Sequence, residues 1–360
     1  MPPPPEPLDY LPHLPPKRDY GIGVVGAGSI ARAGHLPAYR SAGFHVVGIY
    51  DEDTAKAASL AADFETAAFA SLEALLESPE VAVVDIATPT ITHPPLVDAA
   101  IAAGKHVLCQ KPLTYDIAKA ESMVRDAANA GVRLAVNQNG RWDQAFRSVY
   151  ALQQRGDLGD LTYVQIDRVG PLRWELWPWL WGRPRVLIVE DAIHFLDIVR
   201  FILGEPEWLF ADGFHAGDER IKGETSAIIT LAWPGGAHGL LLNHAGIWDD
   251  DTHATYRFEG TAGVAKGDLG VFYNFPYGRE DTLTYRSQSH GEDWITPELQ
   301  GKWIPDALVG PMAELFAAIQ EDREPMNSGA DNLRTLCLVE AAYESIAERR
   351  AVRPRTPPAL

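Results

Sequence analysis

The 360-residue sequence predicts an α/β protein whose N-terminal half forms a doubly wound parallel sheet. Short β-branched segments alternate with alanine-rich helical segments from residue 20 to residue 139. A glycine turn joins the first strand to the first helix, and the second half contains several further segments that read as strands. The length favours two domains, and 46% hydrophobic residues suffice for a sizeable core.

The alternation in the first half is regular. Strands are predicted at residues 20–28, 45–51, 81–89, 105–112 and 132–139, and helices at 29–43, 52–64, 93–104 and 116–131. Nearly continuous apolar strands separated by helices are typical of a parallel sheet covered on both faces. Ligands of such sheets bind at the carboxyl ends of the strands, so polar residues at those ends are candidate site residues.

A glycine turn of the pattern GxGxxA follows the first strand, from Gly26 to Ala31. Gly26 permits the tight turn, Gly28 lets the backbone approach a pyrophosphate, and a small Ala31 lets helix and strand pack closely. Phosphate would rest on the helix N-terminus, which begins with Ser29 and Ile30. We interpret this as a dinucleotide site of a Rossmann domain; the alternative is a plain strand–helix turn.

Asp51 ends the second strand, where a carboxylate can accept hydrogen bonds from an adenosine ribose diol. The same charge repels the 2′-phosphate of NADP, at on the order of 1–4 kcal/mol for each charge pair at ~4 Å. Glu52 and Asp53 add negative charge, and no arginine follows directly. NAD is therefore favoured over NADP, with capping of the next helix by Asp51 as the alternative.

The composition argues against several classes of partner and location. A formal net charge of -18 repels nucleic acid and anionic membrane surfaces. The two cysteines, Cys109 and Cys337, lie in apolar surroundings and indicate no disulfide framework, and no apolar run is long enough to span a membrane. Residues 1–20 form a proline-rich tail, suited to packing on a neighbouring surface, without the apolar region of a secretory signal. We expect a cytoplasmic protein.

The second half combines strands with one chemically distinctive helix. Strands are predicted at residues 161–169, 207–215, 225–233, 237–245 and 253–260, with a hairpin turn at 234–236 and a last helix over 331–350. Within a helix over residues 189–206, the spacing places Glu190, His194 and Asp197 on one face. A histidine held by a carboxylate can remove a hydroxyl proton. The alternatives are a core histidine and a metal site; we expect no metal, because no further ligand cluster is evident.

Several phrases together resemble the Gfo/Idh/MocA family of oxidoreductases, named for glucose-fructose oxidoreductase and inositol dehydrogenase. They are VGAGSIARAGHLPAY, ATPTITH, GKHVLCQKPL, IHFLDIVRFILGEP, FEGTAGVAKGD and AAYESIAERRAV. The resemblance implies a Rossmann domain over residues 21–141 and a C-terminal α/β domain over 142–352 for substrate binding and oligomerisation. That second domain would hold a large, mostly antiparallel open sheet, and residues 353–360 form a tail.

The resemblance also implies roles for residues near the nicotinamide. Members usually carry Glu-Lys-Pro where this chain has Gln110, Lys111 and Pro112. The lysine lies beside the nicotinamide and the substrate hydroxyl, and Pro112 fixes the backbone that aims it. The cofactor is expected along Thr88, Pro89 and His93, and beside Gln110. The family commonly has aspartate four residues before the helix histidine, where this chain has Glu190; Asp191 is the second choice.

Substrate contacts are predicted from arginine and tryptophan residues. Arg141, with Trp142 beside it, matches a family arginine near substrate; its alternative is an ion pair that joins the domains. The segment 173–185 carries four tryptophans, of which Trp174 and Trp177 suit the C–H faces of a sugar ring. A hydrophobic lip or a subunit contact is the alternative for that segment.

These features predict an NAD-dependent dehydrogenase or reductase that acts on a secondary alcohol of a sugar, cyclitol or sugar acid. Lys111 and His194 would relay the proton, oriented by Glu190 or Asp191. One alternative is a glycosidase or epimerase that uses NAD transiently, and another is a non-catalytic sugar or cofactor sensor. We expect a homo-oligomer, dimer or tetramer, formed through the exposed face of the second-domain sheet.

Overall fold

The computed structural model describes residues 6–246, 251–291 and 293–358, and these fall into two compact units. Of the described residues, the unit called here the Rossmann unit contains 12–139, 304–334 and 357–358. The sheet unit contains 6–11, 140–246, 251–291, 293–303 and 335–356. The structure therefore differs from the single division predicted between residues 141 and 142, because residues 304–334 pack with the N-terminal half.

The Rossmann unit is built on a six-stranded sheet in the described part of the chain, with strand order β3-β2-β1-β4-β5-β6. The strands are β1 (Ile22–Val25), β2 (Val46–Tyr50), β3 (Ala67–Ala68), β4 (Val83–Ile86), β5 (His106–Cys109) and β6 (Leu134–Val136). All pairs are parallel. The order reverses between β1 and β4, which is where doubly wound folds bind their ligands.

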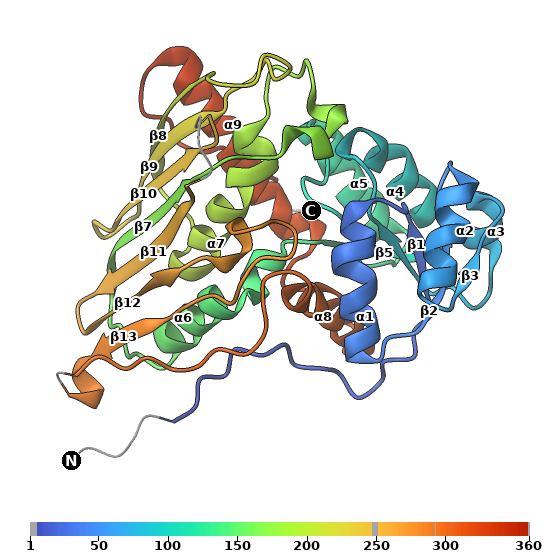
Figure 1. Ribbon diagram of the computed structural model, residues 1–360, viewed down its shortest axis with the longest axis horizontal. Coiled ribbons are helices and arrows are strands. Elements are labelled where there is room, and N and C mark those ends of the chain that lie inside the picture. Colours follow the sequence, from blue (N-terminus) through green and yellow to red (C-terminus); the bar gives the residue numbers. More distant parts are fainter. Residues whose placement is uncertain (1–5, 247–250, 292, 359–360) are drawn as a thin grey trace. The chain divides into compact units, whose positions relative to one another are not determined.

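The predicted strands form because their residues are apolar and buried on both faces, as in β1 and β4, where every residue is buried. The helices that cover them are α1 (Leu36–Ala42), α2 (Thr54–Asp63), α3 (Leu72–Glu77), α4 (His93–Ala102) and α5 (Ile117–Asn129). A π-helical turn, Ala31–His35, precedes α1, and α1 and the other helices are labelled in Figure 1. Side chains of Asp53 and Asp116 cap α2 and α5.

Helix α8 (Val309–Gln320) belongs to the Rossmann unit although it lies far along the chain. Its Phe316 ring packs against Phe44 and Tyr20, each with ring centroids 5.1 Å apart. These contacts join residues nearly 300 positions apart, and sequence periodicity carries no information about them.

The sheet unit contains a seven-stranded sheet in its described residues, with order β13-β12-β11-β7-β10-β9-β8. Its strands are β7 (Leu161–Val169), β8 (Trp208–Phe214), β9 (Ser226–Ala232), β10 (His238–His244), β11 (His253–Gly260), β12 (Gly263–Asp268) and β13 (Thr284–Ser287). β7 and β10 pair in parallel, and the other pairs are antiparallel. This confirms the predicted large, mostly antiparallel sheet.

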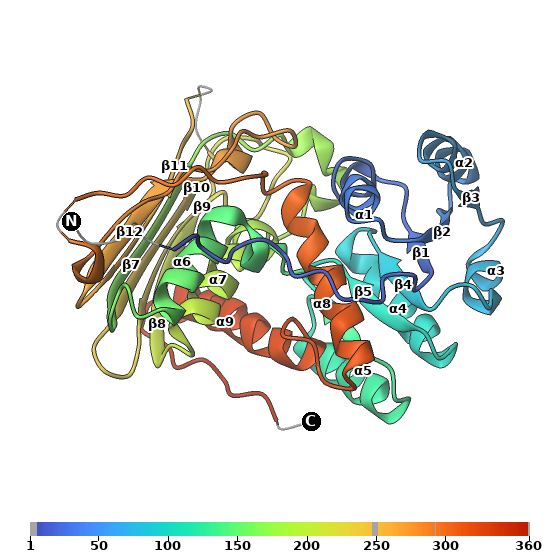
Figure 2. The ribbon, with the colours of Figure 1, turned by 90° about the horizontal axis from the view of Figure 1, so that it is seen from below.

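One face of this sheet is covered by α6 (Gln144–Gln154), α7 (Ile193–Leu203) and α9 (Gly329–Glu348), as Figures 1 and 2 show. Residues along β11 alternate between buried and more exposed, so the opposite face is open. The open face carries the exposed side chains of Phe210, Phe214 and Ile228.

The N-terminal tail packs on its own chain. Tyr10 accepts a hydrogen bond from the Gln300 amide (2.7 Å) within the sheet unit. Lys17 and Gln320 exchange two backbone–side-chain hydrogen bonds within the Rossmann unit. Residues 1–5 lie outside the described residues.

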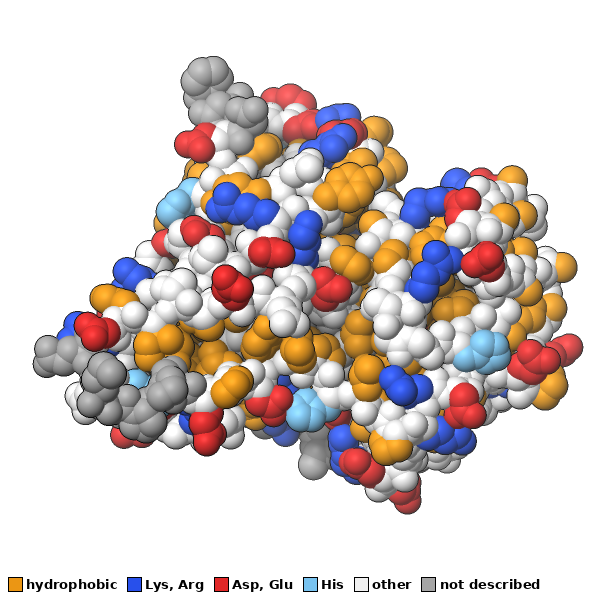
Figure 3. Space-filling view, turned by 60° about the horizontal axis from the view of Figure 1, so that its bottom comes forward, with side chains coloured by type: hydrophobic (Ala, Val, Ile, Leu, Met, Phe, Trp, Pro, Cys, Tyr) orange, Lys and Arg blue, Asp and Glu red, His pale blue; other side chains and the backbone are white. Residues whose placement is uncertain are grey.

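On the face that Figure 3 shows, acidic side chains are interspersed with basic ones. Among the described residues, every helix is too short or too polar to cross a bilayer.

Candidate functional site

The glycine turn lies at the point where the strand order of the Rossmann unit reverses. Gly26 follows β1 with φ of 110°, and its N–H donates to the Tyr50 carbonyl (2.7 Å). A Cβ on Gly26 would lie 2.7 Å from the Ala87 carbonyl oxygen and 3.0 Å from Thr88 Cγ2. Glycine is required there by both conformation and space.

Gly28 differs from Gly26, because no atom lies within 4 Å of the position that a Cβ would occupy. The helix begins at Ser29 and continues through Ile30 into the π-helical turn. The first N–H groups of a helix lack intrahelical acceptors and favour an anion. The open space at Gly28 and the helix start beside it fit the pyrophosphate of a dinucleotide.

Asp51 is held at the end of β2 by two backbone amides. Its Oδ2 accepts from Ala27 N–H (2.7 Å) in the glycine turn, and its Oδ1 accepts from Asp53 N–H (2.9 Å). The cap of α2 is Asp53, which accepts from the N–H groups of Ala55 and Lys56. The alternative in which Asp51 caps the next helix is therefore wrong.

The Lys111 turn follows β5, and two side chains brace it. Gln110 Oε1 accepts from Lys111 N–H (3.1 Å), and the Lys111–Pro112 peptide bond is cis. His93 is fully buried, with Nδ1 2.9 Å from the Pro112 carbonyl and Nε2 2.9 Å from the Thr88 carbonyl. Burial lowers the pKa of His93, and the nearby charge of Lys111 adds to this effect.

The residues after β4 connect the glycine turn to the Lys111 turn. Thr88 lies beside Gly26, its hydroxyl accepts from Thr92 Oγ1 (2.8 Å), and its carbonyl contacts His93. Thr88 and Pro89 are both partly exposed, whereas His93 is enclosed. His93 is thus a brace between two segments of the predicted cofactor site.

His194 lies in the first turn of α7, which follows a second π-helical turn, Ile188–Ala192. Its half-buried ring meets Trp303 edge to face, with centroids 5.5 Å apart at 84°. Glu190 lies within the π-helical turn, and its N–H donates to the Val186 carbonyl. Single π-helical turns inside helices are frequent at functional sites.

The second-choice carboxylate, Asp191, is turned toward the sheet. Its Oδ2 accepts from Asn243 Nδ2 on β10 (2.6 Å). It also lies near Arg168 on β7, where burial lowers the arginine pKa and the Asp191 charge opposes that change. These partners engage the Asp191 carboxylate on the side of the sheet.

Arg141 forms a buried ion pair with Asp197. Arg141 Nε and Nη2 donate to the two Asp197 carboxylate oxygens (2.7 and 2.6 Å), and Asp197 also accepts from Thr335 Oγ1. The ion-pair alternative thus describes Arg141, although both partners belong to the sheet unit and so do not join the two domains. The buried ion pair supports a structural role for Arg141 in place of the predicted substrate contact.

The predicted tryptophan contacts divide into two groups. Trp142 and Trp174 are buried in the sheet unit and are not accessible. Trp177 is half-buried and packs on Phe275, with ring centroids 5.5 Å apart. Of the three, Trp177 remains a candidate for substrate contact.

Asp197, the third residue of the predicted helix face, accepts hydrogen bonds from Arg141 and Thr335. Within the described ranges, histidine, cysteine and acidic side chains form no group of three that could hold a metal ion.

Two positioning features were not predicted. Glu224 accepts from the N–H groups of Val186 and Ile188 and from Tyr343 OH, so a buried carboxylate fixes the start of the His194 helix. His35 and Asp85 form a buried pair beneath the Lys111 turn (2.7 Å). The sequence contains one sign of this pair, because Asp85 is a charged residue inside the otherwise apolar strand β4.

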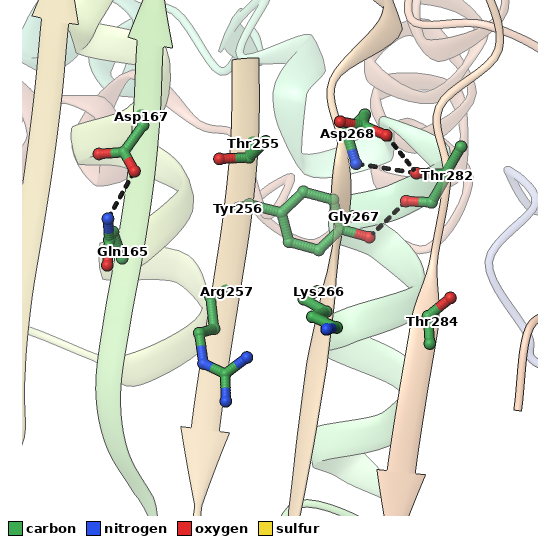
Figure 4. Close-up of a pocket in the computed structure, with 10 residues that line it drawn as sticks. All are labelled: Gln165, Asp167, Thr255, Tyr256, Arg257, Lys266, Gly267, Asp268, Thr282 and Thr284. Atoms are coloured by element: carbon green, nitrogen blue, oxygen red, sulfur yellow. Dashed lines mark hydrogen bonds between the residues drawn. The ribbon is translucent and has the colours of Figure 1, made fainter. Parts of the chain in front are cut away.

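A polar cavity of about 400 Å³ lies elsewhere, on the open part of the large sheet. Figure 4 shows its lining from β7, β11, β12 and β13, including Asp167, Arg257, Lys266 and Thr284. Gln165 donates to Asp167 beside it. None of the predicted site residues lines this cavity, and it is distinct from the site described above.

The fold and the strand-end residues define a two-unit oxidoreductase with a dinucleotide-binding Rossmann unit. The model of the oxidoreductase family with an NAD-binding Rossmann fold matches residues 20–138. The model of the GFO/IDH/MocA C-terminal domain matches residues 146–272. The chain belongs to the Gfo/Idh/MocA family and is an enzyme of the dehydrogenase and reductase class.

Relatives and a solved structure extend the similarity over most of the chain. A D-apiose dehydrogenase from Paraburkholderia graminis is 29% identical over 91% of this chain and 88% of its own length. A 1,5-anhydro-D-fructose reductase from Ensifer adhaerens is 32% identical over 93% of this chain and 98% of its own. An oxidoreductase from Agrobacterium radiobacter, solved with NAD+, L-tartaric acid and magnesium, superposes with a TM-score of 0.81 at 26% identity, covering 93% and 98%.

Proposed function

We propose that this protein is an NAD(H)-dependent dehydrogenase or reductase that acts on a secondary alcohol of a sugar, cyclitol or sugar acid. The observation that carries the proposal is a continuous set of contacts at the carboxyl edge of the parallel sheet. Gly26 lies against Thr88, Thr88 contacts His93, and His93 contacts Pro112 beside Lys111. A glycine turn suited to pyrophosphate and a braced lysine thus share one rigid edge.

The chain's own residues fit NAD better than NADP. The Asp51 carboxylate can accept from a ribose diol while it retains its two backbone donors, since each oxygen has further acceptor capacity. Arg32, a nearby cation on the first helix, is already paired with Asp63 (2.5 Å). When bound, the nicotinamide supplies the hydride acceptor for oxidation or the donor for reduction.

The proposed proton relay uses Lys111 and His194. Oxidation of a secondary alcohol requires a base for the hydroxyl proton while the hydride leaves carbon. We assign the base to His194, oriented by Glu190, and the positioning of the hydroxyl oxygen to Lys111, whose positive charge lowers the hydroxyl pKa. Lys111 belongs to the Rossmann unit and His194 to the sheet unit. The role of each residue is therefore tested with a variant of its own.

The proposed substrate class rests on Trp177 and on the similar proteins. A partly exposed indole can pack on the C–H face of a sugar ring. The similar proteins are named for activities on apiose and anhydrofructose. We propose a small polyhydroxylated substrate on this basis.

The test is NADH formation, followed by its absorbance, over a panel of polyols, sugars and sugar acids. Kinetics of variants follow once a substrate is found. Lys111→Met and His194→Ala should each lower kcat by roughly 10²–10⁴ while NAD binding persists. Glu190→Gln should cost less than His194→Ala if its role is orientation. His253→Ala, an exposed histidine on β11, is the matched control and should match the wild type.

Two results would change the assignment. Near wild-type turnover by His194→Ala would show that Lys111 acts alone and that the histidine is a packing residue. Conversion of substrate without accumulation of NADH would indicate transient use of the cofactor, as in a glycosidase or epimerase.

We further propose a cytoplasmic homo-oligomer. Cys109 and Cys337 are buried thiols that form no disulfide, which fits a reducing compartment. Phe210, Phe214 and Ile228 project from the open face of the large sheet at 39%, 57% and 48% exposure. Covering this face by a second copy would bury them.

A further inference from the structure

A buried hydrogen-bonded chain runs beneath the Lys111 turn, within the Rossmann unit. His35, in the π-helical turn after the glycine turn, places Nδ1 2.7 Å from Asp85 Oδ2 on β4. Tyr39 OH donates to the same carboxylate oxygen (2.8 Å) and lies 3.3 Å from His35 Nδ1. The side chains of His35, Tyr39 and Asp85 are fully buried.

The other ring nitrogen of His35 faces amides. Its Nε2 lies 2.7 Å from Gln110 Nε2 and 3.3 Å from Asn137 Nδ2. Gln110 is 7% exposed, and its Oε1 accepts from the main-chain N–H of Lys111. The chain therefore connects a buried carboxylate to the backbone of the proposed catalytic lysine.

The main-chain N–H of Lys111 can only donate, and this fixes the donor and acceptor roles of Gln110 and His35. The Lys111 N–H is a donor, so the Gln110 atom that faces it is the amide oxygen. The Gln110 NH2 group then faces His35 Nε2, which must be unprotonated to accept from it. The ring proton lies on Nδ1, where it is donated to Asp85.

We propose that Asp85 and His35 are positioning residues for Lys111, a role that rests on the function proposed above. Asp85 selects the Nδ1–H tautomer of His35. That tautomer fixes the orientation of the Gln110 amide, and the amide oxygen holds the Lys111 main chain. The side chains of Asp85 and His35 act through Gln110 without touching substrate or cofactor.

Removal of the Asp85 carboxylate should reverse the direction of the hydrogen bonds along this chain. In Asp85→Leu, the apolar strand β4 gains an apolar residue, so folding is expected to persist. Tyr39 OH can then donate to His35 Nδ1, which moves the ring proton to Nε2. A protonated Nε2 confronts the Gln110 NH2 group and favours rotation of the amide, which turns the NH2 group toward Lys111 N–H.

An acid at position 110 should compensate for the acid lost from position 85. In the double variant Asp85→Leu/Gln110→Glu, one carboxylate oxygen can accept from His35 Nε2–H and the other from Lys111 N–H. The hydrogen-bonded chain is complete again, with its acid on the opposite side of the imidazole. A structural role for Asp85 alone predicts no such rescue.

The experiment measures kcat, KM and NAD affinity for the wild type, Asp85→Leu and the double variant. Asp85→Leu should lower kcat by roughly 10²-fold with NAD affinity little changed, as expected for a misplaced reacting group. The double variant should recover most of that loss. Wild-type kcat in Asp85→Leu, or a double variant no better than Asp85→Leu, would overturn the proposal.

Nitrogen-15 NMR of labelled histidine provides a readout that does not depend on activity. The wild type should show His35 protonated at Nδ1, and Asp85→Leu should show it protonated at Nε2. An Nε2–H tautomer in the wild type would refute the hydrogen-bonded chain itself. The expected tautomers together with an inactive wild type would instead contradict the proposed function.

Discussion

At the residue scale, Asp51 combines a charge with a structural hydrogen bond, and two substitutions separate them. Asp51→Asn retains an oxygen that can accept from Ala27 N–H but removes the negative charge, whereas Asp51→Ala removes both. The wild type should bind NAD more tightly than NADP. Both variants should narrow that preference, because they remove repulsion of a 2′-phosphate worth on the order of 1–4 kcal/mol.

Titration calorimetry with both cofactors measures this preference. Asp51→Ala should lose more NAD affinity than Asp51→Asn, because the glycine turn also loses its brace. Equal affinities of the wild type for NAD and NADP would contradict the assignment of cofactor.

The two glycines of the turn provide a second residue-scale prediction. Gly28→Val fills space that holds no protein atom, so it should abolish NAD binding with little change in the melting temperature. Gly26→Ala forces a Cβ to 2.7 Å from the Ala87 carbonyl at positive φ, so it should destabilise the protein itself. Calorimetric binding and thermal melts of both variants test this contrast. A Gly28→Val protein that binds NAD normally would make the turn purely structural.

The site residues at strand ends could be predicted from the sequence, whereas the buried residues that position them could not. Asp51 and Lys111 follow directly after apolar strands, and the alternation of strand and helix places those ends together. His35 and Asp85 lie 50 positions apart and meet only through the packing of a helix on a strand. Arg141 was ambiguous for the same reason, because its partner Asp197 lies 56 positions away.

At the element scale, a buried carboxyl pair links helix α6 to the loop after β12. Asp143 caps α6 through Phe146 N–H (3.1 Å), and Asp281 accepts from Gly270 N–H (2.5 Å). Burial raises the pKa of both carboxyls, and the charge of Asp281 raises that of Asp143 further. The pair therefore retains a proton in the folded protein that an unfolded aspartate, with a pKa of about 3.9, has already lost.

The sign of the resulting pH dependence follows from proton release on unfolding. Above about pH 4 the unfolded chain binds fewer protons at these sites, so stability falls as the pH rises toward the raised pKa. The slope is about 1.4 kcal/mol per pH unit for one proton. Asp143→Asn keeps the cap but needs no shared proton, so it should flatten this slope and stabilise the protein at neutral pH.

Urea unfolding of the wild type and Asp143→Asn between pH 5 and pH 8 measures the slope. Asp53→Asn is the matched control, since it alters an exposed helix cap whose carboxylate pKa is lowered by hydrogen bonds to Lys56. The stability contributed by the Asp53 carboxylate is lost only as the pH falls through its lowered pKa. Above pH 5, Asp53→Asn should therefore show the same slope of unfolding free energy against pH as the wild type. Parallel slopes for the wild type and Asp143→Asn would rule out the shared proton.

Elements with strong periodicity were predicted, and those that depend on distant partners were missed. Strands such as β7 and β10 are rich in residues that favour strands, and their burial alternates between one covered and one open face. Helices α6 and α8 were not identified. β12 and β13 were missed too, because glycine and charged residues make β12 weakly patterned, and it is stabilised by pairing with β11.

At the scale of the whole molecule, chain order and spatial units diverge. Residues 304–334 return to the Rossmann unit after the whole large sheet has been completed, and residues 335–356 return to the sheet unit. A single boundary in the sequence therefore cannot separate the two units, because the chain passes between them more than once. The open face of the large sheet, by contrast, was expected from the resemblance to the family, and the proposed oligomer depends on that face.

The last prediction concerns that face. Phe214→Asp and Ile228→Asp place charges where the proposed contact would bury apolar side chains, so each should shift the protein toward the monomer. Both positions are already exposed in the single chain, and the monomer should therefore keep its fold. Met326→Asp, an exposed apolar position in the Rossmann unit, is the control and should leave the assembly unchanged. Size-exclusion chromatography with light scattering measures the mass of each variant. A wild-type protein that is monomeric at micromolar concentration would remove the oligomer, and disruption by Met326→Asp alone would move the interface to the other unit.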